Sequence, residues 1–204
     1  MVWIILYIIV WVALIASGIA PYDRFTWALE VSWVVGGLVL LPILSKRDVK
    51  ITPIAKLLMF IHALVLIYGG LYTYARTPLG EYMREWFGFE RNHYDRIGHF
   101  LQGFVPAILA REVLIRKNVI NGRWWNHFLV FCICVAFSAL FELIEFGAAV
   151  LFASGADSYL GSQGDIWDAQ WDILFCSVGT IASLLILSPF HDRQIKKIIK
   201  HAED

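Results

Sequence analysis

Ionisable residues recur at helical spacing inside the apolar part of this sequence. Within each group the members stand three or four positions apart, which places them on one face of an α-helix. A charged side chain inside a membrane is costly, so such residues usually face a cavity, a partner or a metal. The groups are Asp23, Trp27 and Glu30; Asp95, His99 and Gln102; Glu142 and Glu145; and Asp165, Asp168 and Asp172.

These residue types point to a bound cation. So many carboxylates cannot stay together as bare anions where the dielectric is low, so some must be protonated, paired with Arg96 or bound to a metal. Carboxylates with one or two imidazoles suit Zn, Mn or Fe, and carboxylates alone suit Mg or Ca. We therefore expect a divalent metal. Its expected ligands are His99, Glu142, Glu145, Asp168 and Asp172.

The other polar residues have expected roles around that metal. Asp95 and Asp165 are the expected general bases, and Arg96 is expected to hold an anionic head group. Asp165 has a second interpretation, because an aspartate at the start of a helix caps its free N–H groups. In a plainer alternative, all these residues only hydrogen-bond the helices together. The side chains expected to bind substrate are Gln102, Gln163, Tyr94 and Glu30.

Composition and the length of the apolar stretches place the chain in a membrane. Of its 204 residues, 59% are hydrophobic and 17% are charged, against about 45–50% and about 25% in soluble domains. The apolar stretches also match the roughly 20 residues that a helix needs to cross a bilayer. The sequence predicts one all-α domain of six transmembrane helices. The spans are roughly residues 2–20, 26–44, 55–75, 97–115, 126–152 and 166–188.

Basic residues set the expected orientation. Twelve Lys and Arg lie in the even-numbered loops and the C-terminal segment, and five lie in the odd-numbered loops. Because basic residues accumulate on the cytoplasmic side, both termini are expected in the cytoplasm. Apolar residues at helical spacing between 79 and 87 also favour a helix on the membrane surface. An ordinary aromatic belt segment is the alternative for this stretch.

The polar groups are expected to lie at the same depth in the membrane. A helix rises about 1.5 Å per residue, so in this topology every group lies within roughly 10–15 Å of the outer surface. We therefore expect one site in the outer half of the bilayer. His191 follows Asp165 by 26 residues, or about 39 Å of helix, and is expected at the opposite face. His62 is expected to be a packed residue of the inner half.

Charge and cysteine usage exclude other classes of protein. The 17 basic residues balance 17 acidic ones, so no basic patch favours binding of nucleic acid. Cys132 and Cys134 stand two positions apart and point to different sides of a helix. The sequence therefore predicts neither a disulfide nor a paired-cysteine metal site.

Longer motifs resemble a known family, the YjdF-like bacterial inner-membrane proteins. The resemblance covers nearly the whole chain and implies a multi-pass protein of the bacterial inner membrane. It implies no particular activity and assigns no role to any residue. The motifs are residues 94–104 (YDRIGHFLQGF), Arg111-Glu112, residues 137–145 (FSALFELIE), residues 161–172 and His191-Asp192-Arg193.

Three functions are compatible with these patterns. The first is a metal-dependent enzyme that hydrolyses or transfers a group on a lipid or lipid-linked substrate, because a metal activates water or polarises a phosphoryl or carbonyl oxygen. The second is a transporter or channel for cations or protons, although the inner halves of the spans are almost wholly apolar. The third is a non-catalytic binding or assembly protein.

Overall fold

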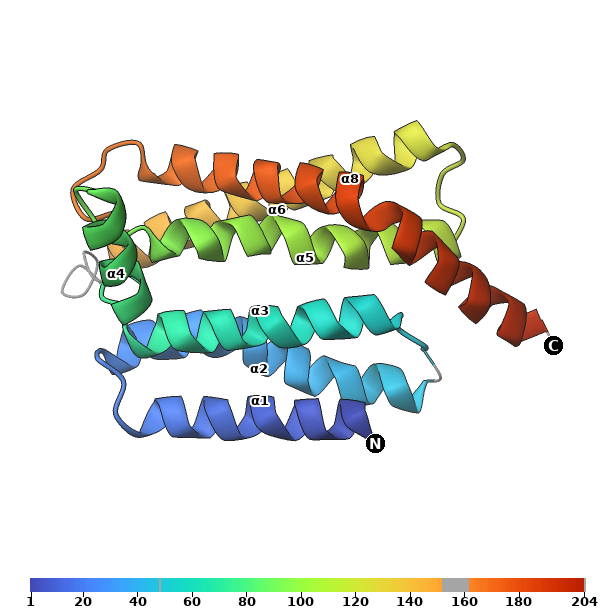
Figure 1. Ribbon diagram of the computed structural model, residues 1–204, viewed down its shortest axis with the longest axis horizontal. Helices are drawn as coiled ribbons and strands as arrows, with labels where there is room; N and C mark the ends of the chain where they lie inside the picture. Colours follow the sequence, from blue (N-terminus) through green and yellow to red (C-terminus); the bar gives the residue numbers. More distant parts are fainter. Residues whose placement is uncertain (48, 152–161, 204) are drawn as a thin grey trace.

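Every regular element is a helix in the computed structural model, which describes residues 1–47, 49–151 and 162–203. The all-α prediction is confirmed for these residues; the fifth loop and Gly161 lie outside them. The helices, labelled in Figure 1, are α1 (Val2–Ile19), α2 (Arg24–Lys46), α3 (Pro53–Leu71), α4 (Pro78–Phe87), α5 (Tyr94–Arg116), α6 (Arg123–Leu151) and α8 (Asp168–Glu203).

The long helices form two layers. Helices α1, α2 and α3 pack around an apolar cluster that includes Leu14, Val31 and Ile67. Helices α5, α6 and α8 pack around a second cluster that includes Val130 and Cys176. Contacts between α3 and α5 join the layers, and α4 lies across their end (Figure 1). We call this end the α4 end, and we call the opposite end, which holds both chain termini, the terminal end.

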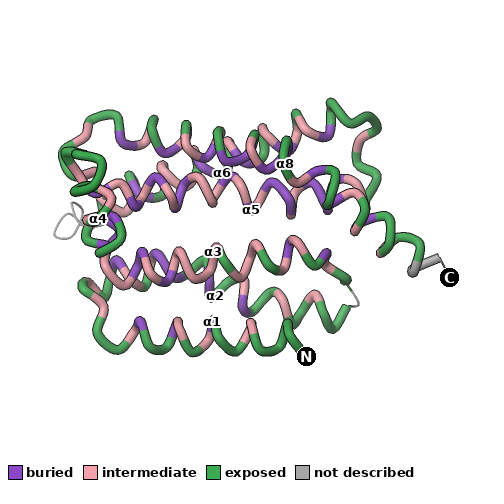
Figure 2. The backbone as a smooth tube through the Cα atoms, viewed as in Figure 1, coloured by how far each residue is buried: buried purple, intermediate pink, exposed green. Residues whose placement is uncertain are grey.

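The outward faces of both layers are exposed, as the green positions in Figure 2 show, and many of the exposed side chains are large and hydrophobic. On α1, the side chains of Ile4, Ile8, Val12 and Ile15 are all more than half exposed. A continuous apolar surface of this kind is unfavourable in water. Inside a bilayer the same surface contacts lipid, which agrees with the membrane assignment.

Five helices are long and apolar enough to cross a membrane, namely α1, α2, α3, α6 and α8. Helix α5 is not among them because charged residues, including Asp95, Arg96, Arg111 and Glu112, lie near its two ends. The predicted count of six spans is therefore not confirmed by length and composition. Helix α5 nevertheless has 23 residues and runs alongside α6 and α8 (Figure 1).

Local sequence signals set several helix ends. The Asp23 carboxylate accepts a hydrogen bond from the Thr26 N–H at 2.7 Å and caps α2. This backbone hydrogen bond holds the pKa of Asp23 below its ordinary value. Pro53 and Pro78 open α3 and α4, where the missing N–H is not needed. Gly88, with φ of 66°, ends α4, so the helix predicted near 79–87 is present.

Two predicted spans have different ends in the structure. Helix α3 ends at Leu71 rather than near 75, because the chain makes tight turns over residues 72–76. Helix α8 continues to Glu203 rather than ending near 188, because Pro189 interrupts one backbone hydrogen bond without ending the helix. The last part of α8 bends away from the bundle, as expected of a helix that contains proline (Figure 1).

Glycines allow the backbones of α5 and α8 to touch. A Cβ at Gly103 would overlap the Cys176 carbonyl oxygen, and a Cβ at Gly179 would overlap the Phe100 carbonyl oxygen. Small residues serve this purpose in membrane helix pairs, because packing replaces the hydrophobic effect there. The close approach fixes the register of α5 against α8, and thereby the site described next.

Candidate functional site

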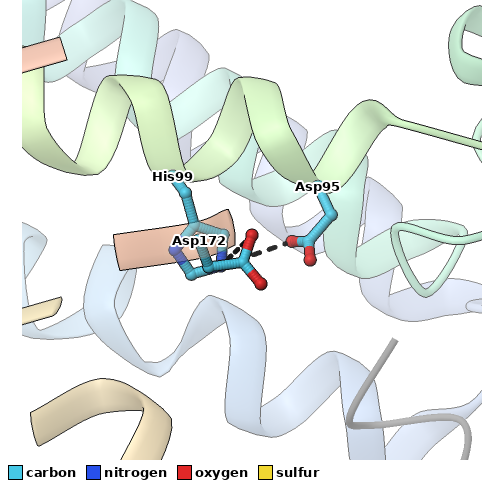
Figure 3. A group of neighbouring side chains, drawn as sticks. All are labelled: Asp95, His99 and Asp172. Atoms are coloured by element: carbon cyan, nitrogen blue, oxygen red, sulfur yellow. Dashed lines mark ion pairs between the residues drawn. The ribbon is translucent and has the colours of Figure 1, made fainter. Parts of the chain in front are cut away.

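Three side chains from α5 and α8 meet near the α4 end, as Figure 3 shows. Asp95 and His99 stand one helical turn apart on α5, and Asp172 faces them from α8. The His99 Nε2 atom lies 3.6 Å from an oxygen of Asp95 and 3.6 Å from an oxygen of Asp172. One ligand atom from each residue lies within 4.8 Å of the others. His99 and Asp172 are buried.

A hydrogen bond to Gln102 determines the tautomer of His99, and therefore which ring nitrogen is the acceptor that faces the carboxylates. The Nδ1 atom of His99 lies 2.9 Å from Gln102 Oε1. An amide oxygen only accepts, so Nδ1–H is the donor. In the neutral imidazole the lone pair is then on Nε2 and points between Asp95 and Asp172. The three atoms that face one another are all acceptors, and the Asp172 oxygen also accepts from Arg96. A proton or a cation between the three atoms would offset their mutual repulsion.

The spacing of these acceptors fits a shared metal. Zinc binds nitrogen and oxygen ligands at about 2.0–2.2 Å, which puts neighbouring ligand atoms about 3.3–3.6 Å apart in a tetrahedral site. The two observed separations of 3.6 Å are close to this range and too long for hydrogen bonds. The Nδ1–H to Gln102 is also the contact that orients a metal-binding histidine in many proteins.

Two arginines lie on the side of the site nearer the α4 end. Arg96 contacts Asp172, and it contacts Asp168 at 2.6 Å. Arg91 contacts Asp168 at 2.7 Å and Asp165 at 3.3 Å. Asp165 also accepts a hydrogen bond from the Trp167 N–H at 2.9 Å, in the turn that precedes α8. Arg96 is thus engaged by aspartates rather than free to hold an anionic head group.

Three more carboxylates reach the same region without hydrogen bonds among the described residues. An oxygen of Glu142 is buried and unbonded, 3.8 Å from His99 Nδ1. Glu30 and Glu145 are also buried and accept no hydrogen bond within the described part of the chain. Seven carboxylates therefore gather around His99, while Arg91 and Arg96 are the arginines that pair with them there. The excess negative charge calls for protons or a cation.

A strained turn brings Tyr74 to this region. Thr73 and Tyr74 have φ of 56° and 49°, a conformation that costs free energy for residues other than glycine. The Tyr74 ring is buried and packs on Gly98 of α5, where a Cβ would lie 2.9 Å from the ring. Burial and the nearby Glu30 carboxyl raise the pKa of the Tyr74 phenol well above its usual range.

A cavity of about 640 Å³ extends from these residues between the two layers. Its α4 end is lined by Glu30, Tyr74, Asp95, His99 and Glu145. Most of the remaining lining is apolar. The lining includes Leu38, Leu41, Phe60, Leu66, Val105 and Leu109, and it reaches Ser45 and Lys56 near the terminal end.

The structure gathers the predicted site residues but uses some differently. Tyr94 donates its hydroxyl to the Val65 carbonyl at 3.1 Å and so braces α3. Gln163 exchanges two hydrogen bonds with the Asn92 backbone, at 2.8 and 3.1 Å. Gln102 and Glu30 line the cavity. Asp168 is held by the two arginines, and Asp95 takes its place beside His99.

Sequence reasoning missed several contributors to the site. Arg91 resembles an ordinary loop cation, and its contact with Asp168 joins residues 77 positions apart. Asn92 is buried and donates to the Thr77 carbonyl at 3.0 Å, which ties α4 to the start of α5. His62 lines the cavity, and its buried Nε2 atom has no hydrogen-bond partner among the described residues. The motif that begins at Tyr94 is the sequence signal nearest to Arg91 and Asn92.

A family of membrane proteins matches almost the whole chain. The family model described as predicted membrane protein, DUF2238, matches residues 2–193. The chain belongs to the DUF2238 family. It is also similar to inner membrane protein YjdF of Escherichia coli strain K12, with 44% identity over 184 residues, or 90% of this chain and 88% of that protein. No solved structure matches the chain. The resemblance inferred from the motifs is confirmed, and the apolar helices agree with a multi-pass inner-membrane protein.

A second buried polar network of this DUF2238 protein lies toward the terminal end. His191 Nε2 lies 3.2 Å from Glu112, and Glu112 also accepts from the Thr52 hydroxyl at 2.6 Å. Arg111 contacts His191 Nδ1 at 3.2 Å and also contacts Asp192. Because arginine only donates, His191 Nδ1 accepts and its Nε2–H donates to Glu112. This network joins α5, α8 and the start of α3.

Proposed function

We propose that this DUF2238 protein is a metal-dependent membrane enzyme. It binds a divalent cation through His99, Asp95 and Asp172, with Glu142 beside them, and acts on a lipid or lipid-linked substrate. The observation that carries the proposal is the meeting of three acceptor atoms, since the Nδ1–H of His99 is committed to Gln102. A metal is the partner that satisfies all three atoms at once.

The chemistry fits hydrolysis or group transfer. A bound metal activates water or polarises a phosphoryl or carbonyl oxygen. The buried carboxylates of Glu30, Glu142 and Glu145 have no hydrogen-bond partner among the described residues, so each is free to take a proton from an attacking group. Arg91 and Arg96 hold the aspartates in place and limit how many carboxylates the metal must neutralise. Asp165 is an alternative general base at the start of α8.

The membrane placement follows from the same helices. We take α5 as the sixth span, because both termini lie at one end of the bundle and that requires an even number of crossings (Figure 1). Buried ion pairs at its ends offset the cost of its charges. The even-numbered loops and the C-terminal segment carry twelve basic residues and the odd-numbered loops carry five, which favours cytoplasmic termini. The His99 site is then in the outer half of the bilayer.

A matched pair of aspartates tests the metal. Asp172 and Asp192 both lie on α8, and each accepts from an arginine, Arg96 or Arg111. The protein carrying Asp172→Asn should lose most of the metal that the purified parent contains, measured by mass spectrometry of the metal. The Asp192→Asn protein should retain it. A parent that contains no metal and does not take up Zn, Mn, Fe or Mg after dialysis would overturn the proposal.

Transport of cations or protons is the second candidate, favoured by one observation. His62 lines the cavity between the carboxylates and the terminal end, and its buried Nε2 atom has no hydrogen-bond partner among the described residues. The lining beyond it is mostly apolar, which gives an ion few partners along the rest of the path. Ion or proton flux into liposomes that depends on His62 would favour transport. A protein with neither metal nor flux would be a non-catalytic binding or assembly protein.

A further inference from the structure

The cavity between the layers has the dimensions of a hydrocarbon chain. It follows α2 from Glu30 to Ser45, which are 15 residues apart and therefore about 22 Å at 1.5 Å per residue. A volume of about 640 Å³ over about 22 Å corresponds to a mean cross-section of about 29 Å². The space thus extends along most of the length of α2. It suits an extended chain better than a compact molecule.

The chemistry of the lining changes along this length. The carboxylates, His99 and Tyr74 are at one end, and apolar side chains follow for most of the remaining path. A ligand that satisfies both parts has one polar end and one long apolar tail. The polar end would lie at the acceptor group of Asp95, His99 and Asp172, and the tail would replace contacts with water along Leu38, Phe60, Leu66 and Val105.

The two layers also leave a route from the surrounding lipid. Helices α2 and α6 meet through Trp33, whose ring packs edge-on against Phe137 at 5.2 Å and is tilted against Phe141 at 6.0 Å. All three residues line the cavity, and Trp33 and Phe137 are also exposed on the outward surface. A chain that enters between α2 and α6 never leaves an apolar environment.

We infer that the cavity binds a single long linear hydrocarbon chain, acyl or isoprenoid, whose polar head lies at the His99 site. This inference rests on the proposed function, because it names the class of lipid that the site acts on. Two neighbouring glycines of α2 provide a matched test. A Cβ at Gly37 meets open space and Gly37 lines the cavity, whereas Gly36 also meets open space but is exposed outward.

The test uses photoreactive lipids in membranes that contain the full chain. One probe is a palmitoyl lysophospholipid with a diazirine near the end of its chain, and the other is a diazirine-bearing isoprenyl phosphate. The parent should be labelled on cavity-lining residues by at least one probe, and the probe that labels identifies the kind of chain. Gly37→Phe should label at least about tenfold less, since every two buried methylenes contribute roughly one order of magnitude to affinity.

The control is Gly36→Phe, which makes the same change in helix propensity on the lipid-facing side of α2. This variant should be labelled as strongly as the parent. Gly37→Leu is a smaller obstruction and should give an intermediate loss if Gly37→Phe does not fold. Equal labelling of the parent, Gly36→Phe and Gly37→Phe, or labelling only outside the cavity, would overturn the inference.

Metal measured in the same samples separates this inference from the proposed function. Both glycine variants should retain the metal of the parent, because neither residue contacts the His99 site. Metal present without labelling of the cavity contradicts the chain-binding inference alone. Labelling blocked by Gly37→Phe in a protein without metal supports chain binding and contradicts the metal-dependent enzyme.

Discussion

At the scale of single residues, the His99 site is defined by hydrogen-bond acceptors that face one another. The Nε2 atom of His99 and the facing oxygens of Asp95 and Asp172 are acceptors brought within 4.8 Å of one another. Glu142 adds a buried, unbonded oxygen 3.8 Å from the other nitrogen of the ring. Arrangements of this kind are unfavourable unless a proton or a cation is shared. Whether these residues are protonated therefore depends on whether they bind a metal.

Glu142→Gln distinguishes a ligand from a helix-bonding residue. The amide has the same shape as the carboxylate without its charge, so metal affinity should fall about 10- to 100-fold if Glu142 binds or supports the metal. If Glu142 is a neutral hydrogen-bonding group, the substitution should change little. The measurement is metal affinity and thermal stability in detergent, with and without chelator. Glu85→Gln, on the exposed face of α4, is the control and should match the parent.

At the scale of elements, the α5–α8 contact positions the site. Asp95 and His99 come from α5 and Asp172 from α8, so their separation depends on how closely these helices approach. Gly103 and Gly179 allow backbone contact on either side of the interface. An added methyl group at either position must push the helices apart.

Gly103→Ala should therefore destabilise the protein by about 1–3 kcal/mol, the usual cost of overpacking, and should lower metal content as His99 moves from Asp172. Gly147→Ala on α6 is the matched control. A Cβ there meets nothing within 4 Å, so the substitution should be neutral or stabilising by up to about 1 kcal/mol through helix propensity. Thermal unfolding and metal analysis of both proteins provide the comparison. Equal behaviour of the two variants would contradict this role of Gly103.

At the scale of the whole molecule, the two buried polar networks lie far apart along α8. Asp168 and His191 are 23 residues apart, or about 35 Å of helix. His191→Ala should leave Arg111 and Glu112 short of a partner and cost about 1–3 kcal/mol of stability. Metal content should not change, because the site at the α4 end is too distant. A folded His191→Ala protein that loses its metal would contradict this separation.

The orientation of the bundle is tested with single cysteines. In intact cells, Glu85→Cys on α4 should react with a membrane-impermeant thiol reagent, and Lys117→Cys after α5 should react only after lysis. The parent is the control, because Cys134 and Cys176 are buried and Cys132, which is exposed, lies within the apolar helix α6. The reverse pattern would place the termini outside the cytoplasm.

Local periodicity in the sequence predicted most of the helices and the faces on which the polar residues lie. The apolar stretches predicted the helices, since length and hydropathy are properties of consecutive residues. The spacing of Asp95, His99, Glu142, Glu145 and Asp172 predicted that these side chains share faces and depth. The helix near 79–87 followed from the same periodicity. The count of six spans did not follow as directly, because the charges of α5 weaken the hydropathy on which that count depends.

The tertiary structure decided how those faces are used. Arg91 meets Asp168 across 77 residues and Arg96 meets Asp172 across 76, and no local spacing records such pairings. They depend on the backbone approach at Gly103 and Gly179, on the turn that brings in Tyr74, and on the separation of the two layers that forms the cavity. Sequence periodicity fixes the direction of a side chain on its own helix. Only packing between helices fixes which side chain, proton or space it faces.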